Sequence, residues 1–339
     1  MKEFKIIQSS EVSRNAWQEY VENHQYGTIF HLPYMYDVYK ASANHDAYAF
    51  FAVDANNNIR ALLSGYLQTI KSGFLSSITT RSVMLQAPIF SCTEALRALL
   101  KHYQSCMKAN AVFSEIRNHY MDKDYTDVCT REGFQWEGHY NILKIIPEKE
   151  EQLWKDISRK RKDGINKSKR FGFIFGWDNE TEISGAFYKL LKNQYSKLRL
   201  PIPESDFFHN CINFDTQSYC KFFNLFDGQG MSISLMTFQF KSILHVMYIG
   251  IDQSPEFIKK RPVDFFYYQL LRWCVENKIS VFDWMGAGKP GAHYGVRDFK
   301  LQYGGALVDV GRFLSIHSAT KYILAKTGFK MLQSLRRRH

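Results

Sequence analysis

The sequence predicts an α/β protein built from two similar modules, each a mixed, mostly antiparallel sheet with helices packed against it. The chain has 339 residues, of which 45% are hydrophobic and 16% aromatic, and this composition is typical of a folded globular protein. A chain of this length exceeds what one core usually supports, so about two domains are expected. The order helix, hairpin, strand, helix, strand then occurs twice along the sequence.

The first module is expected over residues 1–148. Residues 11–25 have the apolar spacing of a helix, and a second helix is expected up to Lys40. Two strand-like runs flank the Asp/Asn-rich turn DANNN and predict a hairpin. An apolar strand ending at Pro88, a helix beginning at Thr93 and the strand AVFSEIRN complete this module.

The second module is expected over residues 149–318. A basic helix over residues 150–170 and helices over 183–198 and 205–212 precede a hairpin with the turn DGQG and the strand ILHVMYIGID. A helix is expected from Pro262 to about Glu276, because proline suits the first helical position and Asp264 suits the first turn. This helix is apolar almost all round, which predicts that both its sides are covered.

The remaining residues, 319–339, predict a basic C-terminal helix. Its apolar residues stand among lysines and a run of three arginines. The pattern fits a terminal helix docked on the body of the protein, and it also fits a helix that lies on an anionic membrane surface. No apolar run is long enough to span a membrane, and residues 1–10 lack the apolar core of a signal peptide. A cytoplasmic protein, peripheral at most to the inner membrane face, is expected.

The charge balance indicates which partners the protein binds, and the cysteines indicate whether it carries a metal or a covalent cofactor. The chain carries 44 Lys and Arg against 33 Asp and Glu, for a net charge of +11, so a phosphate-bearing partner or an anionic surface is favoured. The six cysteines form no Cys-x-x-Cys pair and have no histidine at zinc-ligand spacing. We therefore expect reduced thiols, no metal site and no covalently bound cofactor.

The segment 281–310 is the strongest candidate for chemistry. Asp283 lies in an apolar strand, where a buried carboxylate needs a partner, and Arg297 or Lys300 could supply it. On the strand expected there, Lys300 could stabilise developing negative charge, or it could be a surface lysine with apolar neighbours. The loop GAGKPGAHYG does not match a Walker A motif, and no helix is expected directly after it. A tight turn and a ligand cradle both remain open for this loop.

Two clusters of positive charge are candidate phosphate sites. One is the basic helix, with the segment SRKRKDGINKSKRFG, and the other directly precedes the helix at Pro262, where the helix terminus favours anions. A solvated basic face without a partner is an equal alternative for the first. The candidate donor-binding residues are Arg159, Arg161, Lys162, Lys259, Lys260 and Arg261.

These segments together resemble one known family. The chain is similar to the C-terminal half of the Fem-type peptidoglycan aminoacyltransferases and their CelD-like relatives in the GNAT superfamily. Four segments carry the similarity, in this order: the basic helix, KLLKNQYSKLRLPIP, HVMYIGID and F-D-x-x-G…G-x-x-x-F-K-x-x-Y-G-G. The resemblance covers residues 150–312. Of its parts, the last pattern, from F-D to G-G, is the most specific to the family. It implies two tandem GNAT-like domains, the first of them degenerate and matched only through FHLPYMYDVYK.

The resemblance also implies a reaction and residue roles. An acyl or aminoacyl group would pass from acyl-CoA or aminoacyl-tRNA to an amine of a cell-envelope precursor, such as one of peptidoglycan or polysaccharide, or to another polar acceptor. Lys300 would lie near the reacting carbonyl or the substrate anion, and Lys40 would contact the acceptor's phosphates. From its position in the sequence, Asp283 is a second candidate catalytic residue, which could accept a proton or orient the amine. The other candidate substrate-binding residues are Arg199, Tyr248, Tyr294 and Phe299.

Two departures from the family leave the donor open. The long helical-hairpin insert of some members that use aminoacyl-tRNA is absent, and the segment before Pro262 lacks the Q/R-x-x-G-x-G/A pattern of ordinary acetyl-CoA users. A nucleic-acid-binding module and an inactive scaffold with the same fold are the competing hypotheses, although no known nucleic-acid-binding signature accompanies the charge.

Overall fold

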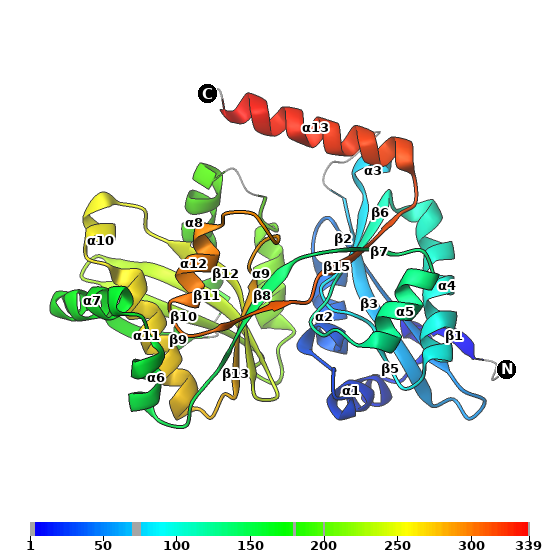
Figure 1. Cartoon of the computed structure of the whole chain (residues 1–339), viewed down its shortest axis with the longest axis horizontal. Coiled ribbons are helices and arrows are strands. Elements are labelled where there is room, and N and C mark those ends of the chain that lie inside the picture. Colours follow the sequence, from blue (N-terminus) through cyan, green and yellow to red (C-terminus); the bar gives the residue numbers. More distant parts are fainter. Residues whose placement is uncertain (1–3, 70–75, 179–180, 199–200, 338–339) are drawn as a thin grey trace. The chain divides into compact units, whose positions relative to one another are not determined.

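The chain folds into two compact units, each with its own sheet (Figure 1). A computed structural model describes residues 4–69, 76–178, 181–198 and 201–337. The first unit comprises Met1–Gly138 and Val310–His339, and the second comprises His139–Asp309. Each unit is described by itself below.

The sheet of the first unit has eight strands in the order β1-β2-β3-β4-β6-β15-β7, with β5 paired to β3. All its pairs are antiparallel except β4 with β6. The strands are β1 (Lys5–Gln8), β2 (His45–Val53), β3 (Ile59–Gln68), β4 (Arg81–Met84), β5 (Ile89–Phe90), β6 (Phe113–Arg117), β7 (Gln135–Glu137) and β15 (Arg312–Ile316).

Helices cover both faces of this first sheet. On β2, Phe50 belongs to the buried cluster that contains Tyr103 of α4, and the next residue, Phe51, lies against the ring of Trp17 of α1, 5.0 Å away. Neighbouring strand residues point to opposite faces, so α1 and α4 lie on opposite sides. The helices are α1 (Arg14–Asn23), α2 (Pro33–Ala41), α3 (Ser76–Thr79), α4 (Thr93–Asn110), α5 (Lys123–Arg131) and α13 (Ala319–Arg337).

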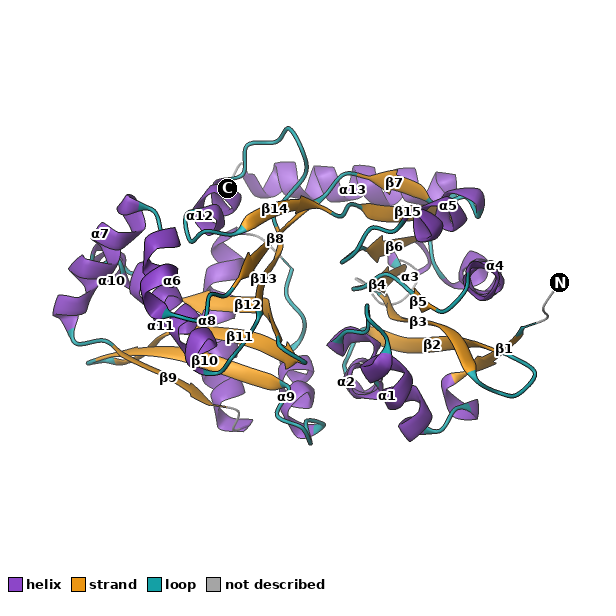
Figure 2. Cartoon of the chain, turned by 60° about the horizontal axis from the view of Figure 1, so that its bottom comes forward, coloured by secondary structure: helices purple, strands orange, loops and turns teal. Residues whose placement is uncertain are grey.

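The sheet of the second unit has seven strands in the order β14-β8-β13-β12-β11-β10-β9 (Figure 2). Its pairs are antiparallel except that of β12 with β13. The strands are β8 (Tyr140–Ile145), β9 (Ile174–Asp178), β10 (Cys220–Asp227), β11 (Gly230–Phe240), β12 (Ile243–Ile251), β13 (Val281–Gly286) and β14 (Ala306–Asp309).

The helices of the second unit also lie on two faces. Phe222 of β10 contacts Phe187 of α8, and Phe223 contacts Trp273 of α11, with ring separations of 5.0 and 4.8 Å. Alternation along the strand therefore places α8 and α11 on opposite sides. The helices are α6 (Glu150–Asp156), α7 (Arg159–Ser168), α8 (Thr181–Leu198), α9 (Ser205–Asn213), α10 (Pro255–Lys259), α11 (Pro262–Glu276) and α12 (Gly295–Leu301).

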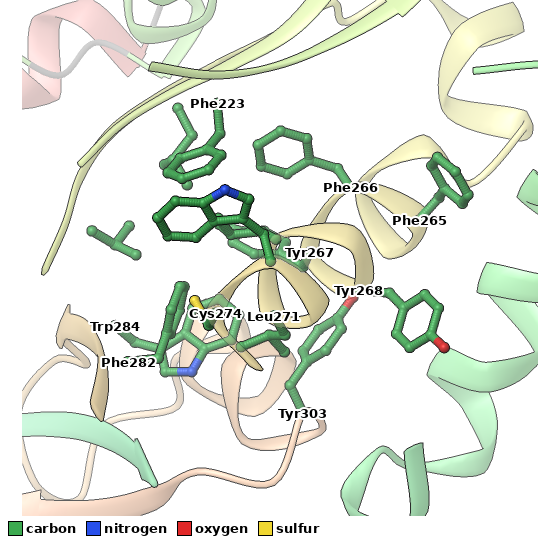
Figure 3. Close-up of a cluster of buried hydrophobic side chains, with 14 of the residues drawn as sticks. Phe223, Phe265, Phe266, Tyr267, Tyr268, Leu271, Cys274, Phe282, Trp284 and Tyr303 are labelled. Atoms are coloured by element: carbon green, nitrogen blue, oxygen red, sulfur yellow. The ribbon is translucent and has the colours of Figure 1, made fainter. Parts of the chain in front are cut away.

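Helix α11 is the centre of the core of the second unit, as Figure 3 shows. It has the predicted bounds, Pro262–Glu276, and its residues Phe266, Leu270 and Leu271 are fully buried. Trp284 of β13 and Tyr303 pack against its Tyr267, with ring separations of 4.7 and 5.8 Å. The prediction that this helix is covered on both sides is confirmed.

The two predicted modules exchange one strand each: β8 was expected in the first module but belongs to the second unit, and β15 was expected in the second module but belongs to the first unit. The sequence did not indicate this exchange. Strand β8 follows β7 along the chain, yet it pairs with β13 and β14 of the second sheet. Strand β15 follows β14, yet it pairs with β6 and β7 of the first sheet. The predicted boundaries, 1–148 and 149–318, therefore differ from those of the structure. Pairing across the exchange is a long-range property, so local sequence patterns do not reveal it.

The predicted basic helix over residues 150–170 is two helices. Helix α6 ends at Asp156, Ile157 and Ser158 are extended, and α7 begins at Arg159. The amide of Ser158 donates to the carbonyl oxygen of Gln302 at 2.8 Å. The break thus ties the start of α7 to the residue that follows α12.

A buried lysine links α6 to the second sheet. The side chain of Lys144 on β8 is fully buried, and its Nζ donates to Asp156 Oδ2 at 2.9 Å and to the carbonyl oxygen of Gly304 at 3.5 Å. A buried ammonium group is costly unless it is paired. Asp156 therefore stabilises the fold mainly by compensating this charge.

We expect Asp156→Ala to lower the free energy of unfolding by about 3 kcal/mol, because it leaves the buried ammonium of Lys144 without its carboxylate. The double variant Lys144→Met/Asp156→Ala should recover most of this loss, since both charges are then gone. Urea denaturation followed by circular dichroism measures both effects. As a control, Asp127→Ala removes the exposed ion pair with Lys123 and should cost much less, because solvent screens exposed charges. Equal losses for the two alanine variants would contradict the assignment.

Candidate functional site

Two parallel strands part in the middle of the second sheet. Strands β12 and β13 pair over three positions only, Ile243 with Val281, Leu244 with Phe282 and His245 with Asp283. Beyond His245, β12 pairs with β11 alone, and its register shifts there by a β-bulge. The parting leaves backbone groups of both strands without a neighbouring strand. In an open sheet, the carboxyl ends of such strands are a common place for a ligand.

Asp283 lies where the strands part and is paired with a histidine. It is 4% exposed, and its Oδ2 lies 3.1 Å from Nδ1 of His245, which is also buried. Its Oδ1 accepts a hydrogen bond of 2.7 Å from the amide of Met285. The predicted burial of Asp283 is confirmed. Its side-chain hydrogen-bond partner, however, is His245 rather than Arg297 or Lys300, because β12 supplies a neighbour from 38 residues earlier in the chain.

The first unit has the same parallel arrangement without these polar groups. Strands β4 and β6 also pair over three positions, and the last is Met84 with Ile116. Both side chains are fully buried in the first core. The position of the His245–Asp283 pair is therefore apolar in the first unit, so the described residues place this pair in the second unit alone.

Lys300 lies on a helix and not on the predicted strand. It belongs to α12, and its Nζ donates to the carbonyl oxygens of Trp284 and Gly286 at 2.7 and 2.9 Å. Burial lowers the pKa of Lys300 to about 8, and the nearby carboxylate of Asp283 opposes this shift. The side chain of Lys300 therefore binds backbone carbonyl groups at the end of β13, and it places a positive charge near Asp283.

The glycine-rich loop after β13 forms turns and leads directly into a helix. Gly288 and Gly291 have φ of +81° and +72°, values that favour glycine. Helix α12 begins at Gly295, so the expectation that no helix follows the loop is wrong. Arg297 donates to the carbonyl oxygens of Lys289 and Ala292 within this loop. The loop thus orients α12 and, with it, Lys300.

A basic cavity lies at the start of α11. It has a volume of about 460 Å³ and is lined by Arg159, Lys160, Asp163, Gly164, Lys167 and Arg261. Four of these six residues are cationic, one is anionic and one is glycine. Arg261 is the residue directly before α11, and it has a left-handed backbone with φ of +61°. Positive side chains beside the amino end of a helix form a favourable environment for a phosphate group.

A buried carboxylate holds the wall of this basic cavity in place. Asp264 of α11 is 2% exposed and accepts hydrogen bonds of 2.6 Å from both Arg161 and Arg261, and one of 3.2 Å from the hydroxyl of Tyr303. Arg161 also donates to the side chain of Gln302 at 2.7 Å, and its guanidinium lies over the ring of Phe299. Helices α7, α11 and α12 are joined through this one carboxylate and Arg161.

Only some of the predicted donor-binding residues line the basic cavity. Arg159 and Arg261 line the basic cavity, whereas the side chain of Arg161 is only 11% exposed and faces Asp264. Arg161 is not among the residues that line the basic cavity, and its contact with a donor stays a prediction. Lys162 lies over the ring of Trp154, and Lys260 over the ring of Phe171. Neither of these, nor the exposed Lys259, lines the basic cavity.

The predicted substrate-binding residues are spread over the chain. Tyr294 is exposed at the start of α12, and Phe299 on the same helix packs against Tyr267 and Tyr303. Tyr248 of β12 contacts the ring of Phe208 on α9. Lys40 is exposed on α2 of the first unit, with its ammonium over the ring of Tyr36. Arg199 lies outside the described residues.

Comparison with solved structures identifies the fold. FemX matches with a TM-score of 0.69 and 13% identity, covering 96% of this chain and 99% of that one. The whole architecture, including both units, is therefore shared. This chain has the fold of FemX.

Other structures agree with this fold. A tandem GNAT protein from the clavulanic acid biosynthesis pathway matches with a TM-score of 0.57 and 8% identity, over 93% of this chain and 99% of that one. The C-terminal domain of a putative lysylphosphatidylglycerol synthetase from Agrobacterium fabrum has the same TM-score and 10% identity, covering 94% of this chain and 95% of that one. No protein-family model and no curated protein sequence matches the chain. The predicted Fem-like, duplicated GNAT fold is confirmed.

Sequence reasoning missed two residues of this site, His245 and Asp264. His245 has no local signal, since nothing in the neighbouring sequence indicates that β12 lies beside β13. Asp264 was assigned only to the first turn of its helix. It stands in the otherwise apolar run PVDFFYYQLL, and a single carboxylate in a helix predicted to be covered on both sides was a usable signal for a buried ion pair.

We expect Gly164→Ala to lower the free energy of unfolding by about 1–3 kcal/mol through overpacking between α7 and α11. A Cβ atom at Gly164 would lie 2.1 Å from Oδ2 of Asp264. Thermal and urea denaturation measure the effect. As a control, Gly185→Ala on α8 meets nothing within 4 Å and should stabilise the protein by up to about 1 kcal/mol, because alanine favours helix. Stabilisation by Gly164→Ala would contradict the close packing.

Lys300 should make stability depend on pH in a definite direction. Because its folded-state pKa is lowered to about 8, against about 10.4 for an unperturbed lysine, the unfolded chain binds more protons between these values. Stability rises with pH wherever this holds. We expect the wild type to gain stability relative to Lys300→Met as the pH is raised from about 8 to about 10, and to show a constant difference below that range.

Urea denaturation of both proteins at several pH values measures this change. Lys189→Met on α8 removes an exposed lysine and is the matched control, since its difference from the wild type should not vary over the same range. A decrease for Lys300, or no change, would contradict the lowered pKa.

Proposed function

We propose that this protein transfers an acyl or aminoacyl group from a phosphate-bearing donor to the amine of a polar acceptor. The observation that supports the proposal is the parting of β12 and β13 at the His245–Asp283 pair, in the unit that also carries a basic cavity at the start of α11. Helix α11 connects the end of β12 to the start of β13. Because parallel strands end at the same edge of a sheet, the donor's phosphates and its reactive end would both lie along that edge.

The donor is proposed to be an acyl-CoA or an aminoacyl-tRNA. Both carry phosphates that four cationic side chains could bind, with Arg159, Lys160, Lys167 and Arg261 as the contacts. The names of two proteins of the same fold support the two donors separately: one was solved without acetyl-CoA, and the other is a putative synthetase of lysylphosphatidylglycerol. The chemistry of the cavity favours phosphate and does not select between these donors.

The reaction needs a neutral amine and a place for its proton. The amine nitrogen attacks the carbonyl carbon of the thioester or ester, a C–N bond forms, and the C–S or C–O bond to the donor breaks. In the tautomer that carries its proton on Nδ1, His245 donates to Asp283, and Nε2 is then the proton acceptor. We assign to this pair the transfer of the amine proton to the leaving sulfur or oxygen of the donor, with Asp283 as the group that fixes the ring.

Lys300 is proposed to supply a positive charge to the reacting carbonyl, from a fixed place at the end of β13. With a pKa of about 8 it is mostly protonated at pH 7, and a fixed cation stabilises the oxyanion that develops on the attacked carbonyl. Its bonds to the carbonyl oxygens of Trp284 and Gly286 also fix its ammonium at the end of β13. Tyr248, Tyr294 and Phe299 remain proposed substrate contacts, as does Lys40 for the acceptor's phosphates.

The acceptor is proposed to be the amine of a cell-envelope precursor, in keeping with the fold shared with FemX. Both candidate donors are made in the cytoplasm, so the reaction is assigned to that compartment. A non-catalytic scaffold or nucleic-acid-binding protein with this fold is the alternative, and the experiment below separates it from the enzyme.

The test measures donor binding first. Equilibrium binding of acyl-CoAs and of a charged tRNA pool is compared between the wild type and Lys160→Gln/Lys167→Gln. We expect the double variant to bind its donor at least tenfold more weakly and with a smaller salt dependence, because two phosphate contacts are lost. Lys189→Gln/Lys192→Gln removes two exposed lysines of α8 and should bind like the wild type.

Transfer of a labelled acyl group to nucleotide-linked envelope precursors is then measured in single turnovers. Asp283→Asn should bind donor normally and lower the rate by about 100-fold, the usual loss when a general base no longer functions. Binding of tRNA without transfer to any precursor would favour the scaffold hypothesis. Absence of binding by both donor classes would contradict the proposal.

A further inference from the structure

The C-terminal helix α13 presents two large apolar side chains to solvent. Its first turn is fixed to the first unit, because the ring of Tyr322 lies 5.2 Å from that of Phe113 on β6 and the amide of Tyr322 donates to the carbonyl oxygen of Ser318. The next two residues, Ile323 and Leu324, are 62% and 61% exposed. Both residues lie in the part of α13, up to Gly328, whose side chains the structure describes (Figure 1, red).

Positive charge surrounds this apolar pair. Lys321 and Lys326 are exposed on either side of it. The segment 319–339, ATKYILAKTGFKMLQSLRRRH, has six lysines and arginines and no acidic residue. This is the composition of a helix that lies in the interface of an anionic membrane, where aliphatic side chains enter the boundary of the acyl chains and cations meet the lipid phosphates.

Other occupants fit these two observations less well. Nucleic acid would bind the cations but gain nothing from two exposed aliphatic side chains. A second copy of the same helix would cover the aliphatic pair but bring two clusters of like charge together. Among the residues that the structure describes, no helix is both long enough and apolar enough to cross a bilayer.

We propose that α13 is a membrane-surface helix, which binds the protein to bilayers that contain anionic phospholipids. Ile323 and Leu324 enter the bilayer, and Lys321 and Lys326 contact the phosphate headgroups. The membrane contact depends on α13 alone, so it can be present or absent whatever the reaction of the second unit is.

The test is flotation of the full chain with two kinds of vesicle, phosphatidylglycerol mixed with phosphatidylcholine, and phosphatidylcholine alone. We expect binding to the anionic vesicles only, weakening as salt is raised. Ile323→Asn/Leu324→Asn should lower the partition coefficient at least tenfold, and Lys321→Gln/Lys326→Gln should lower it as well. The matched control is Ile145→Asn/Ile174→Asn, which alters two aliphatic residues of the second unit that are 72% and 68% exposed and should leave binding unchanged.

Several results would overturn the membrane proposal. Absence of binding to anionic vesicles would do so, and so would binding that the asparagine variant of α13 leaves intact while its thermal melt shows a folded protein. Light scattering that shows a dimer, lost in the same variant, would assign the apolar pair to a second copy. Binding of RNA, but not of vesicles, that requires the lysines and not the aliphatic pair would assign α13 to nucleic acid.

Discussion

The second unit depends on one buried carboxylate. Asp264 lies at the first turn of the central helix α11 and accepts from Arg161 of α7, from Arg261 beside it and from Tyr303 beyond α12. Loss of one partner of such a cluster typically costs about 3–5 kcal/mol, because a buried charge is left uncompensated. The same contacts close the wall of the basic cavity and fix the end of α12. Stability and the candidate site are therefore built from the same interaction, and the glycine at position 164 is what lets α7 approach it.

The duplicated architecture explains why the chemistry is assigned to one unit. Both sheets contain one parallel pair that ends after three paired positions. In the first unit the last pair is Met84 with Ile116, which extends the apolar core, and in the second it is His245 with Asp283. An apolar pair stabilises the fold without a partner, whereas a buried histidine and carboxylate are expensive unless they serve a purpose. The exchange of β8 and β15 joins each sheet to the other half of the chain.

Much of the fold follows from local patterns in the sequence. The repeated element order, the hairpins and the bounds of α11 were predicted, because hydrophobic periodicity, turn residues and a helix-initiating proline act over a few residues. The burial of Asp283 followed from its apolar strand. Lys300 was placed on a strand because the segment RDFKLQYGG is short and has no strong helical period. Helix α12 forms there because the loop after β13 and the bonds of Lys300 to Trp284 and Gly286 hold it, and these contacts come from outside the segment.

By itself, the sequence determined the fold class, the basic character, the apolar central helix and the position of a carboxylate and a lysine near the end of the second module. The tertiary structure decided the partners of those groups. Asp283 pairs with a histidine 38 residues away, Arg161 faces a carboxylate rather than solvent, and the last strand of each half joins the other sheet. The physical reason is common to all three. Ion pairs and strand pairs depend on distances in space, and a sequence specifies these only after the chain has brought remote segments together.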